Sequence, residues 1–525
     1  MAAGHEANAR STRRAERRAE RRRRRRRFIG LGVVAMVVVA GVGVGALAVT
    51  GGDEPKKRAS TGPTTTTIPP TTTTTKPPYT GWVDPESAFQ PYYKATVQGL
   101  LTFRGNPTRN YYGLGPVPVA PKVVWQYPGG AMCSISSDGN ETTNWCGNGW
   151  TGQPAVFERD GRTWVVFGAY DRAVHFVDAT TGQDIIPPFP TGDIIKGSPT
   201  IDPDGFPIVY IGSRDNYLRA IAFDRPQPTE LWKLHAKDVS PTMWNDDWDG
   251  SPLVLNDYLF EGGENSQLHI VKLNRATGAD GLVTVAPQLV FNTPGWDDEL
   301  LANVGGQVSI EASVTISGNT LWFSNSGGLV QGWDISGLLT GAGPPVRSFR
   351  YWTGDDTDAT ITIDESGFLY GGTEWERHSA QGRAVGQMWK LNPTVPDAPL
   401  VWSQFDNNEA KSGVWGTPAI YGDVVIFTTY SGRLIGVDRA TGLIRWEKKL
   451  PSPLMASPAV VDGKLIIGDC AGVVHAYDIG TNTLIDPPEI WQVPLGSCIE
   501  ATPAVWKGRI YIGTRGGFEY ALADS

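Results

Sequence analysis

The chain has 525 residues, including 63 Gly, 39 Pro and 19 Trp, and 40% of its residues are hydrophobic, which favours many short strands and tight turns over long helices. Its formal charge of −8 is unevenly divided, because twelve Arg and three Glu give residues 1–27 a charge of +9 and leave −17 for the rest. The acidic C-terminal part is therefore not expected to bind nucleic acid.

The N-terminal residues predict a membrane anchor. Residues 1–27 end in seven consecutive arginines and are expected to form a basic cytoplasmic tail. Residues 28–50 are an uncharged apolar run of the length that a transmembrane helix needs. A signal peptide is the alternative, although the run is long for one and no clear cleavage motif follows. The positive-inside rule then places everything after residue 50 on the extracytoplasmic side of the cell membrane.

Residues 51–80 are rich in Thr and Pro and lack an apolar period. Such a segment cannot bury enough apolar surface to fold, so we expect a disordered, semi-rigid stalk between the membrane and the rest of the chain.

A repeated phrase fills residues 81–525. It consists of an inner strand that opens with Ser/Thr-Pro, a tight turn, two further strands, and a fourth strand that often carries Trp. The openings are spaced 40 to 62 residues apart, which is the size of a four-stranded propeller blade. We count eight of them: QPAVF at 153, SPTID at 198, SPLVL at 251, SVTIS at 313, TITID at 360, TPAIY at 417, SPAVV at 457 and TPAVW at 502.

Ring closure is also predicted. The chain ends after the third strand of its last repeat, and residues 121–127, PKVVWQY, resemble a fourth strand without a preceding blade. Pairing these two segments would remove the open sheet edges. The sequence thus predicts an all-β fold, an eight-bladed β-propeller of four-stranded blades, preceded by a single transmembrane helix.

The phrases SPAVVDGKLIIGDCAGVVHAYD and ATGLIRWEKKL resemble the repeat of the pyrroloquinoline-quinone (PQQ)-like eight-bladed propellers. That superfamily includes quinoprotein alcohol dehydrogenases and a lipoprotein that scaffolds outer-membrane protein assembly. The resemblance covers roughly residues 100–525 and implies the fold more strongly than a function, because one fold hosts unrelated activities.

In such a propeller, the residue two positions before each Ser/Thr-Pro equivalent is expected to face the mouth of the central channel. Thr151 and Met455 take two of these eight positions, and the other six are candidates for binding a ligand or cation. Asp249 and Glu311 are the candidate ligands of a hard cation such as Ca²⁺. The rival interpretation is a ring of solvated charges. The six candidates are Lys196, Asp249, Glu311, Asp358, Trp415 and Glu500.

Three insertions that mix Trp with carboxylates thicken the same face. They predict a platform for a polar or carbohydrate ligand, or else a set of anchors that fix long loops to the ring. The tryptophans concerned are Trp244, Trp248, Trp296 and Trp375.

Four cysteines outside the membrane predict two disulfides. Cys133 and Cys146 bracket one loop, and Cys470 and Cys498 fall on the same face of adjacent blades. We therefore expect the pairs Cys133–Cys146 and Cys470–Cys498.

The predicted function is a membrane-anchored binding or scaffolding module at the cell envelope, with an envelope protein or a small polar or carbohydrate ligand as its partner. The alternative is a dehydrogenase that uses PQQ and Ca²⁺ to oxidise an alcohol or sugar. We favour a non-enzymatic role without a cofactor, because the adjacent cysteines and the CxxCH haem motif of such enzymes are missing from the sequence, and no catalytic residue can be assigned.

Overall fold

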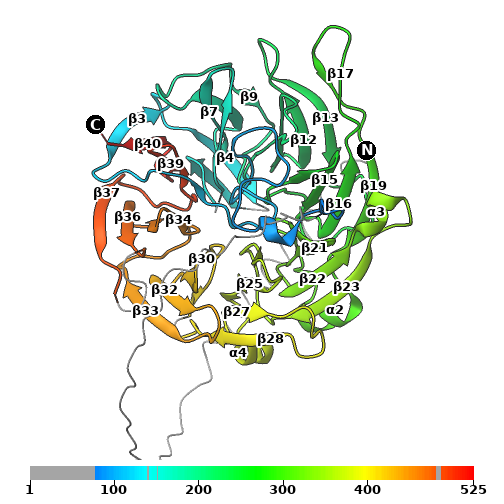
Figure 1. The fold of residues 1–525 in the computed structure, drawn as a ribbon, viewed down its shortest axis with the longest axis vertical. Coiled ribbons are helices and arrows are strands. Elements are labelled where there is room, and N and C mark those ends of the chain that lie inside the picture. Colours follow the sequence, from blue (N-terminus) through cyan, green and yellow to red (C-terminus); the bar gives the residue numbers. More distant parts are fainter. Residues whose placement is uncertain (1–76, 139–140, 151, 409, 481–485, 525) are drawn as a thin grey trace, which may run out of the picture. The chain divides into compact units, whose positions relative to one another are not determined.

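The computed structural model describes residues 77–138, 141–150, 152–408, 410–480 and 486–524. Within the unit formed by residues 79–136 and 143–525, eight sheets are arranged as the blades of a ring (Figure 1). This confirms the predicted all-β, eight-bladed propeller. The predicted cytoplasmic tail, the transmembrane segment 28–50 and nearly all of the stalk lie outside the described residues. Among the described residues, no helix has the length and apolar character needed to cross a membrane.

The first four blades follow one another along the chain, each with its inner strand first. Blade 1 contains β6 (Ala155–Arg159), β7 (Arg162–Ala169), β8 (Ala173–Asp178) and β9 (Phe189–Pro190). Blade 2 contains β10 (Thr200–Ile201), β11 (Ile208–Ser213), β12 (Tyr217–Ala222) and β13 (Thr229–His235). Blade 3 contains β14 (Leu253–Leu255), β15 (Tyr258–Gly262), β16 (Gln267–Lys272) and β19 (Gln288–Pro294). Blade 4 contains β20 (Thr315–Ser317), β21 (Thr320–Phe323), β22 (Leu329–Asp334) and β23 (Val346–Trp352).

The remaining blades repeat this order. Blade 5 contains β24 (Thr362–Ile363), β25 (Leu369–Gly372), β27 (Met388–Leu391) and β28 (Leu400–Gln404). Blade 6 contains β30 (Ala419–Tyr421), β31 (Val424–Thr428), β32 (Arg433–Asp438) and β33 (Ile444–Lys449). Blade 7 contains β34 (Ala459–Val461), β35 (Lys464–Gly468), β36 (Val473–Asp478) and β37 (Glu489–Pro494). Blade 8 contains β38 (Ala504–Trp506), β39 (Arg509–Gly513), β40 (Glu519–Ala523) and β3 (Lys122–Tyr127).

Short helices and two-stranded ribbons lie in the loops outside the eight blade sheets. The helices are η1 (Pro85–Ser87), α2 (Asp298–Val304), α3 (Ser336–Thr340) and α4 (Ala380–Val385). Three two-stranded ribbons pair β4 (Cys133–Asp138) with β5 (Glu141–Cys146), β17 (Ala276–Thr277) with β18 (Val283–Thr284), and β26 (Glu374–Trp375) with β29 (Ser412–Gly413).

Blade 8 closes the ring with a strand from the other end of the sequence. β3 pairs antiparallel with β40, from Lys122 opposite Ala523 to Tyr127 opposite Glu519, which is the pairing expected from the sequence. Figure 1 shows the red β40 beside the cyan β3. The indole of Trp125 in β3 donates to the carbonyl oxygen of Ala179 in blade 1 at 3.0 Å, so this fourth-strand aromatic packs between neighbouring blades.

Turn chemistry explains why these short runs fold into hairpins. The turns between the first and second strands of blades 7 and 8 have positive φ at both central residues, 50° and 70° at Asp462 and Gly463, and 47° and 84° at Lys507 and Gly508. Turns of this kind match the twist of the flanking strands.

The central channel is filled by residues 101–112, which we call the channel segment and which the sequence analysis did not single out. β1 (Gly99–Leu100), just before it, pairs with β6 of blade 1, and β2 (Gly113–Leu114), just after it, pairs with β38 of blade 8. In Figure 1 the blue N-terminal part of the propeller crosses the centre of the ring.

Two fully buried arginines of the channel segment, Arg104 and Arg109, tie the blades together. Their guanidinium groups donate hydrogen bonds of 2.8 to 2.9 Å to backbone carbonyls beside the inner strands of blades 3, 4, 6 and 7. These acceptors are the carbonyl oxygens of Ser251, Val314, Pro418 and Pro458. Around these two arginines, the channel is therefore filled by packed side chains.

Candidate functional site

The loops that lead into the inner strands bring several of the predicted mouth residues together. Asp249, Glu311 and Asp358 line one small cavity of about 10 Å³, together with Trp150 and with Phe103 of the channel segment. The cavity provides room for about one water molecule or ion.

Lys196 is the cation of this cluster. Its ammonium group lies 2.5 Å from Oδ2 of Asp249 and 3.6 Å from Oε1 of Glu264. Burial alone would lower the pKa of Lys196, but the two carboxylates raise it well above its usual value. The lysine is therefore charged, and it offsets part of the negative charge at the mouth.

Glu264 was missed by the sequence analysis. Oxygens of Asp249, Glu264 and Glu311 all lie within 4.8 Å of one another, an arrangement that could hold a metal ion. Glu264 follows the second strand of blade 3, so it approaches the mouth from a turn between strands, whereas the six predicted mouth residues belong to the loops that lead into inner strands. Turns on the same face were the signal that would have found it.

Burial opposes the ionisation of two acids of this cluster, Glu264 and Glu311. Burial raises the pKa of Glu264 well above its usual value, and the nearby charges of Asp249 and Asp247 raise it further. Burial also raises the pKa of Glu311, although hydrogen bonds from Ser309 and Ser326 oppose the shift. An additional cation at this position would let these carboxylates ionise at lower cost.

A second group of acids adjoins the first. Asp358 and Glu374 share a side-chain hydrogen bond, and burial raises the pKa of both well above the usual range. Two carboxyl groups can hydrogen-bond to each other only when one is protonated. Burial also raises the pKa of Asp356 to about 7, although Arg377 lies 3.5 Å from it and opposes the shift. The sequence had indicated only Asp358 of these residues, although alternate residues of an extended segment face the same side.

Trp415 contributes to the mouth through another tryptophan. Its ring lies 5.1 Å from that of Trp150, centroid to centroid, and the ammonium of Lys196 lies 5.8 Å from the Trp150 ring. Trp150 thereby connects the basic and acidic residues of blades 2 to 5 with the aromatic residue of blade 6. Thr151, the neighbouring mouth position, lies outside the described residues.

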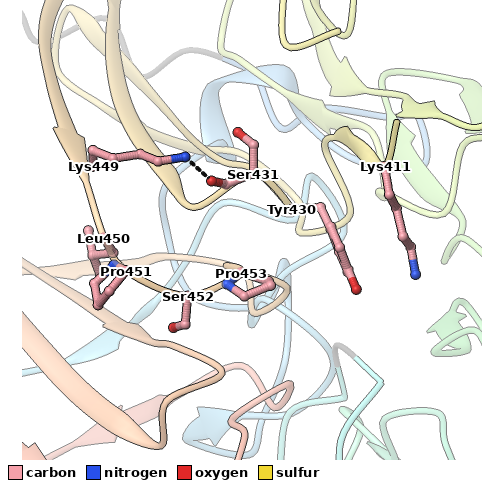
Figure 2. A pocket seen from close by; sticks show the side chains of 8 residues that line it. All are labelled: Lys411, Tyr430, Ser431, Lys449, Leu450, Pro451, Ser452 and Pro453. Carbon is pink, nitrogen blue, oxygen red and sulfur yellow. Dashed lines mark hydrogen bonds between the residues drawn. The ribbon is translucent and has the colours of Figure 1, made fainter. Parts of the chain in front are cut away.

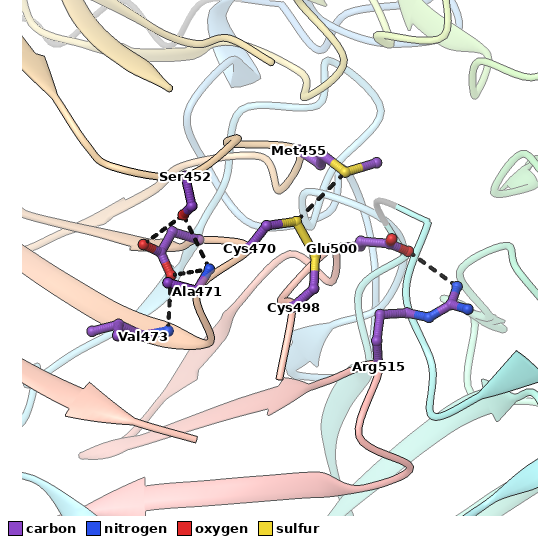
Figure 3. Close-up of a disulfide and its surroundings, with 9 residues drawn as sticks. Ser452, Met455, Cys470, Ala471, Val473, Cys498, Glu500 and Arg515 are labelled. Carbon is purple, nitrogen blue, oxygen red and sulfur yellow. Dashed lines mark hydrogen bonds and ion pairs between the residues drawn. A yellow bond between two sulfur atoms is a disulfide. The ribbon is translucent and has the colours of Figure 1, made fainter. Parts of the chain in front are cut away.

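Glu500 has a different partner. Its carboxylate pairs with Arg515 at 3.3 Å, beside the disulfide Cys470–Cys498 (Figure 3). The Sδ atom of Met455, another mouth position, lies 3.7 Å from Sγ of Cys470. Both predicted disulfides are present, because Cys133 is bonded to Cys146 as well.

The four loop tryptophans do not form one exposed platform. Trp248 and Trp375 are 0% and 2% exposed, and they pack against His269 and His378 at 4.9 and 4.6 Å between ring centroids. These two rings fix their loops to the ring of blades, which favours the alternative that they are anchors. Trp296 is half-buried against the small apolar cluster around α2, and Trp244 is half-buried as well.

The mouth fits a cation better than it fits PQQ. Three converging carboxylates are suitable ligands for a hard cation such as Ca²⁺. A tricyclic quinone needs far more room than a cavity of about 10 Å³ offers, and the chain has no pair of adjacent cysteines to lie against it.

Comparisons with known proteins agree with this fold. The family described as outer membrane protein assembly factor BamB matches residues 394–517. Quinohemoprotein alcohol dehydrogenase ADH IIB of Pseudomonas putida is 33% identical over 130 residues, which are 22% of this chain and only 18% of that protein.

Solved structures resemble the whole ring at low sequence identity. Quinohemoprotein alcohol dehydrogenase ADHIIG of Pseudomonas putida HK5 has a TM-score of 0.55 at 12% identity, with 81% of this chain and 80% of that chain covered. The quinohemoprotein alcohol dehydrogenase of Comamonas testosteroni gives 0.53 at 13% identity with the same coverage of both chains. At such identities the likeness concerns the fold alone.

Proposed function

We propose that this chain, a PQQ-like β-propeller of the BamB type that is related to quinoprotein alcohol dehydrogenases, is a binding or scaffolding module at the cell envelope. Its two disulfides fit an oxidising, extracytoplasmic compartment. The apolar run 28–50 is proposed as the membrane anchor and residues 51–80 as the stalk.

The binding end of the module is the channel mouth. The observation that carries this proposal is the convergence of Asp249, Glu264 and Glu311 within 4.8 Å, with one lysine to balance them. Because these buried carboxyl groups would ionise more easily beside a cation, the mouth favours a positively charged ligand, either a hard cation or a basic group on an envelope partner. Ca²⁺ is the simplest probe of this preference.

A calorimetric titration with Ca²⁺ tests the site. We expect saturable binding that is weakened at least about tenfold in Glu311→Gln, because the variant removes one charged ligand. Glu365→Gln is the matched control, since Glu365 lies between the first two strands of blade 5 and pairs with Arg439 at 2.7 Å. Absence of Ca²⁺ binding, or equal weakening in both variants, would contradict the cation site.

The alternative is a PQQ- and Ca²⁺-dependent dehydrogenase, which the similarity to quinohemoprotein alcohol dehydrogenases favours. Adding PQQ and Ca²⁺ and following dye reduction with alcohols and sugars separates the two functions. We expect no PQQ-dependent reduction, because the mouth cavity is too small for the quinone. Turnover that is lost in Glu311→Gln would establish the dehydrogenase instead.

A further inference from the structure

The channel mouth already holds one ammonium group, which belongs to the chain itself. Lys196 lies in the loop that leads into blade 2, and its ammonium is 2.5 Å from Oδ2 of Asp249, in the loop that leads into blade 3. A second carboxylate, that of Glu264, lies 3.6 Å away, and the ring of Trp150 lies at 5.8 Å. Two carboxylates and one aromatic face are therefore the surroundings of a bound ammonium group in this protein.

The next two loops of the ring repeat the acids without a lysine. Glu311 leads into blade 4 and Asp358 into blade 5, and both line the small cavity at the mouth together with Trp150. No lysine or arginine of the described ranges pairs with Asp358. The groups that act most strongly on its carboxyl group are all acids: Glu311, Asp356, Glu374 and Glu376.

Asp358 also has an unused hydrogen-bond acceptor. Its Oδ1 is buried and has no hydrogen-bond partner among the described residues, while its side chain is hydrogen-bonded to Glu374. Asp356, which is only 8% exposed, likewise has an Oδ1 without a partner, although Arg377 lies 3.5 Å from its other carboxylate oxygen. A buried acceptor without a donor is unfavourable, so this part of the mouth lacks a donor that a ligand can supply.

The cavity suits a primary ammonium group in size and in polarity. Its volume of about 10 Å³ has room for about one water molecule, and an ammonium group is of similar size. The hydroxyls of Ser198, Ser313 and Thr360 line the cavity, and each accepts one backbone N–H and keeps a second lone pair. These oxygens and the carboxyl groups can accept the three N–H bonds of an ammonium group, whereas a planar guanidinium is too large for the cavity.

A larger pocket, of about 500 Å³, between blades 6 and 7 offers no such site (Figure 2). Its lining includes Lys411 and Lys449 and contains no aspartate or glutamate. An ammonium group would find no carboxylate among these lining residues, so the mouth is the place that suits it.

We infer that the mouth binds a second primary ammonium group between Glu311 and Asp358, that of a lysine side chain on a protein partner. The ammonium donates to Oδ1 of Asp358 and to the carboxyl group of Glu311, and Trp150 lies beside it as it lies beside Lys196. This inference rests on the proposed function, in which the mouth binds a positively charged ligand.

A calcium ion would be held by a different set of acids. Its candidate ligands are Asp249, Glu264 and Glu311, so the two ligands share Glu311 but not Asp358 or Glu264. The ammonium group and the calcium ion can therefore be distinguished by variants.

Calorimetry with three capped amino acids tests the assignment. N-acetyl-lysine methylamide carries a primary ammonium, its arginine counterpart carries a guanidinium, and its Nε-acetyl-lysine counterpart keeps the carbon chain without the charge. We expect the lysine compound to bind at least about tenfold more tightly than either of the others. Butylamine, titrated separately, distinguishes a free amine from a lysine side chain.

Two variants then locate the ammonium group. Asp358→Asn should weaken the lysine compound about tenfold or more, and should weaken Ca²⁺ less, because Asp358 is not one of the three acids of the metal cluster. Glu264→Gln should weaken Ca²⁺ more than the lysine compound, because Glu264 belongs to that cluster but does not line the cavity. Glu365→Gln is the control, and thermal unfolding checks that each variant is folded.

The outcomes separate this inference from the proposed function. Equal affinity for the lysine and arginine compounds, or no binding of the lysine compound by a protein that binds Ca²⁺, overturns the inference alone. Absence of binding by both the lysine compound and Ca²⁺ overturns the proposed function as well. Butylamine that binds where the lysine compound does not overturns the lysine side chain as the ligand, and equal losses in Asp358→Asn and Glu365→Gln overturn the location.

Discussion

Removing the guanidinium of Arg109 should destabilise the propeller more than almost any other single substitution. Arg109→Met removes a fully buried guanidinium group that donates four hydrogen bonds. Its acceptors are Oγ1 of Thr102 and the carbonyl oxygens of Phe103, Ser251 and Val314, all at 2.8 to 2.9 Å.

The magnitude follows from the acceptors left behind. Each buried carbonyl without a partner costs about 1 to 3 kcal/mol, so the three carbonyls together cost about 3 to 9 kcal/mol. Burial of the charge itself is unfavourable, since it lowers the pKa of Arg109 to about 10, and removing the charge recovers part of that cost. We expect a net loss of about 4 kcal/mol in the free energy of unfolding.

Guanidinium denaturation followed by tryptophan fluorescence measures this loss. Arg162→Met is the control, because its side chain is half exposed and lies 3.9 Å from Asp178. The control should change the free energy of unfolding by less than about 0.5 kcal/mol. A loss of under about 1 kcal/mol in Arg109→Met would show that the carbonyls around the channel do not depend on this residue.

Two further outcomes are expected. Burial raises the pKa of Asp356 and Asp247 to about 7, so the folded chain retains protons that the unfolded chain releases near pH 4. The contribution of these two groups to stability therefore falls as the pH rises from about 4 to about 7. The melting temperature should drop less between pH 5 and pH 8 in Asp356→Asn than in the wild type, and an equal drop in both would refute the assignment. Trp125→Ala should cost about 3 to 5 kcal/mol in chemical denaturation, because the indole is buried between the last and first blades, and a cost near that of Arg162→Met would contradict its role in closing the ring.

Local patterns accounted for the blades. The Ser/Thr-Pro openings, the turns such as Asp462-Gly463 and the fourth-strand aromatics repeat along the chain. The openings and turns depend on residues close in the sequence, and the aromatics recur at one position of every repeat although they pack between blades. Even the closing strand was predictable, because one fourth strand was missing at one end and one was left over at the other.

The candidate site was predictable only in part. Lys196, Asp249, Glu311 and Asp358 share a position in the repeat, and the structure brings them together. Glu264 and Glu374 occupy other positions, so counting along the repeat could not find them. The sequence also left open whether Trp248 and Trp375 bind a ligand or anchor their loops, and only the tertiary structure shows that both rings are buried.

The sequence by itself determined the number of blades and their closure, since strand period and turn chemistry act between residues close in the chain. Only the tertiary structure decided what fills the channel and which charges meet at its mouth. Arg104 donates to carbonyls more than 300 residues away in the sequence, and no local pattern specifies such partners. Those contacts arise because a closed ring brings the inner strands of all eight blades around one axis.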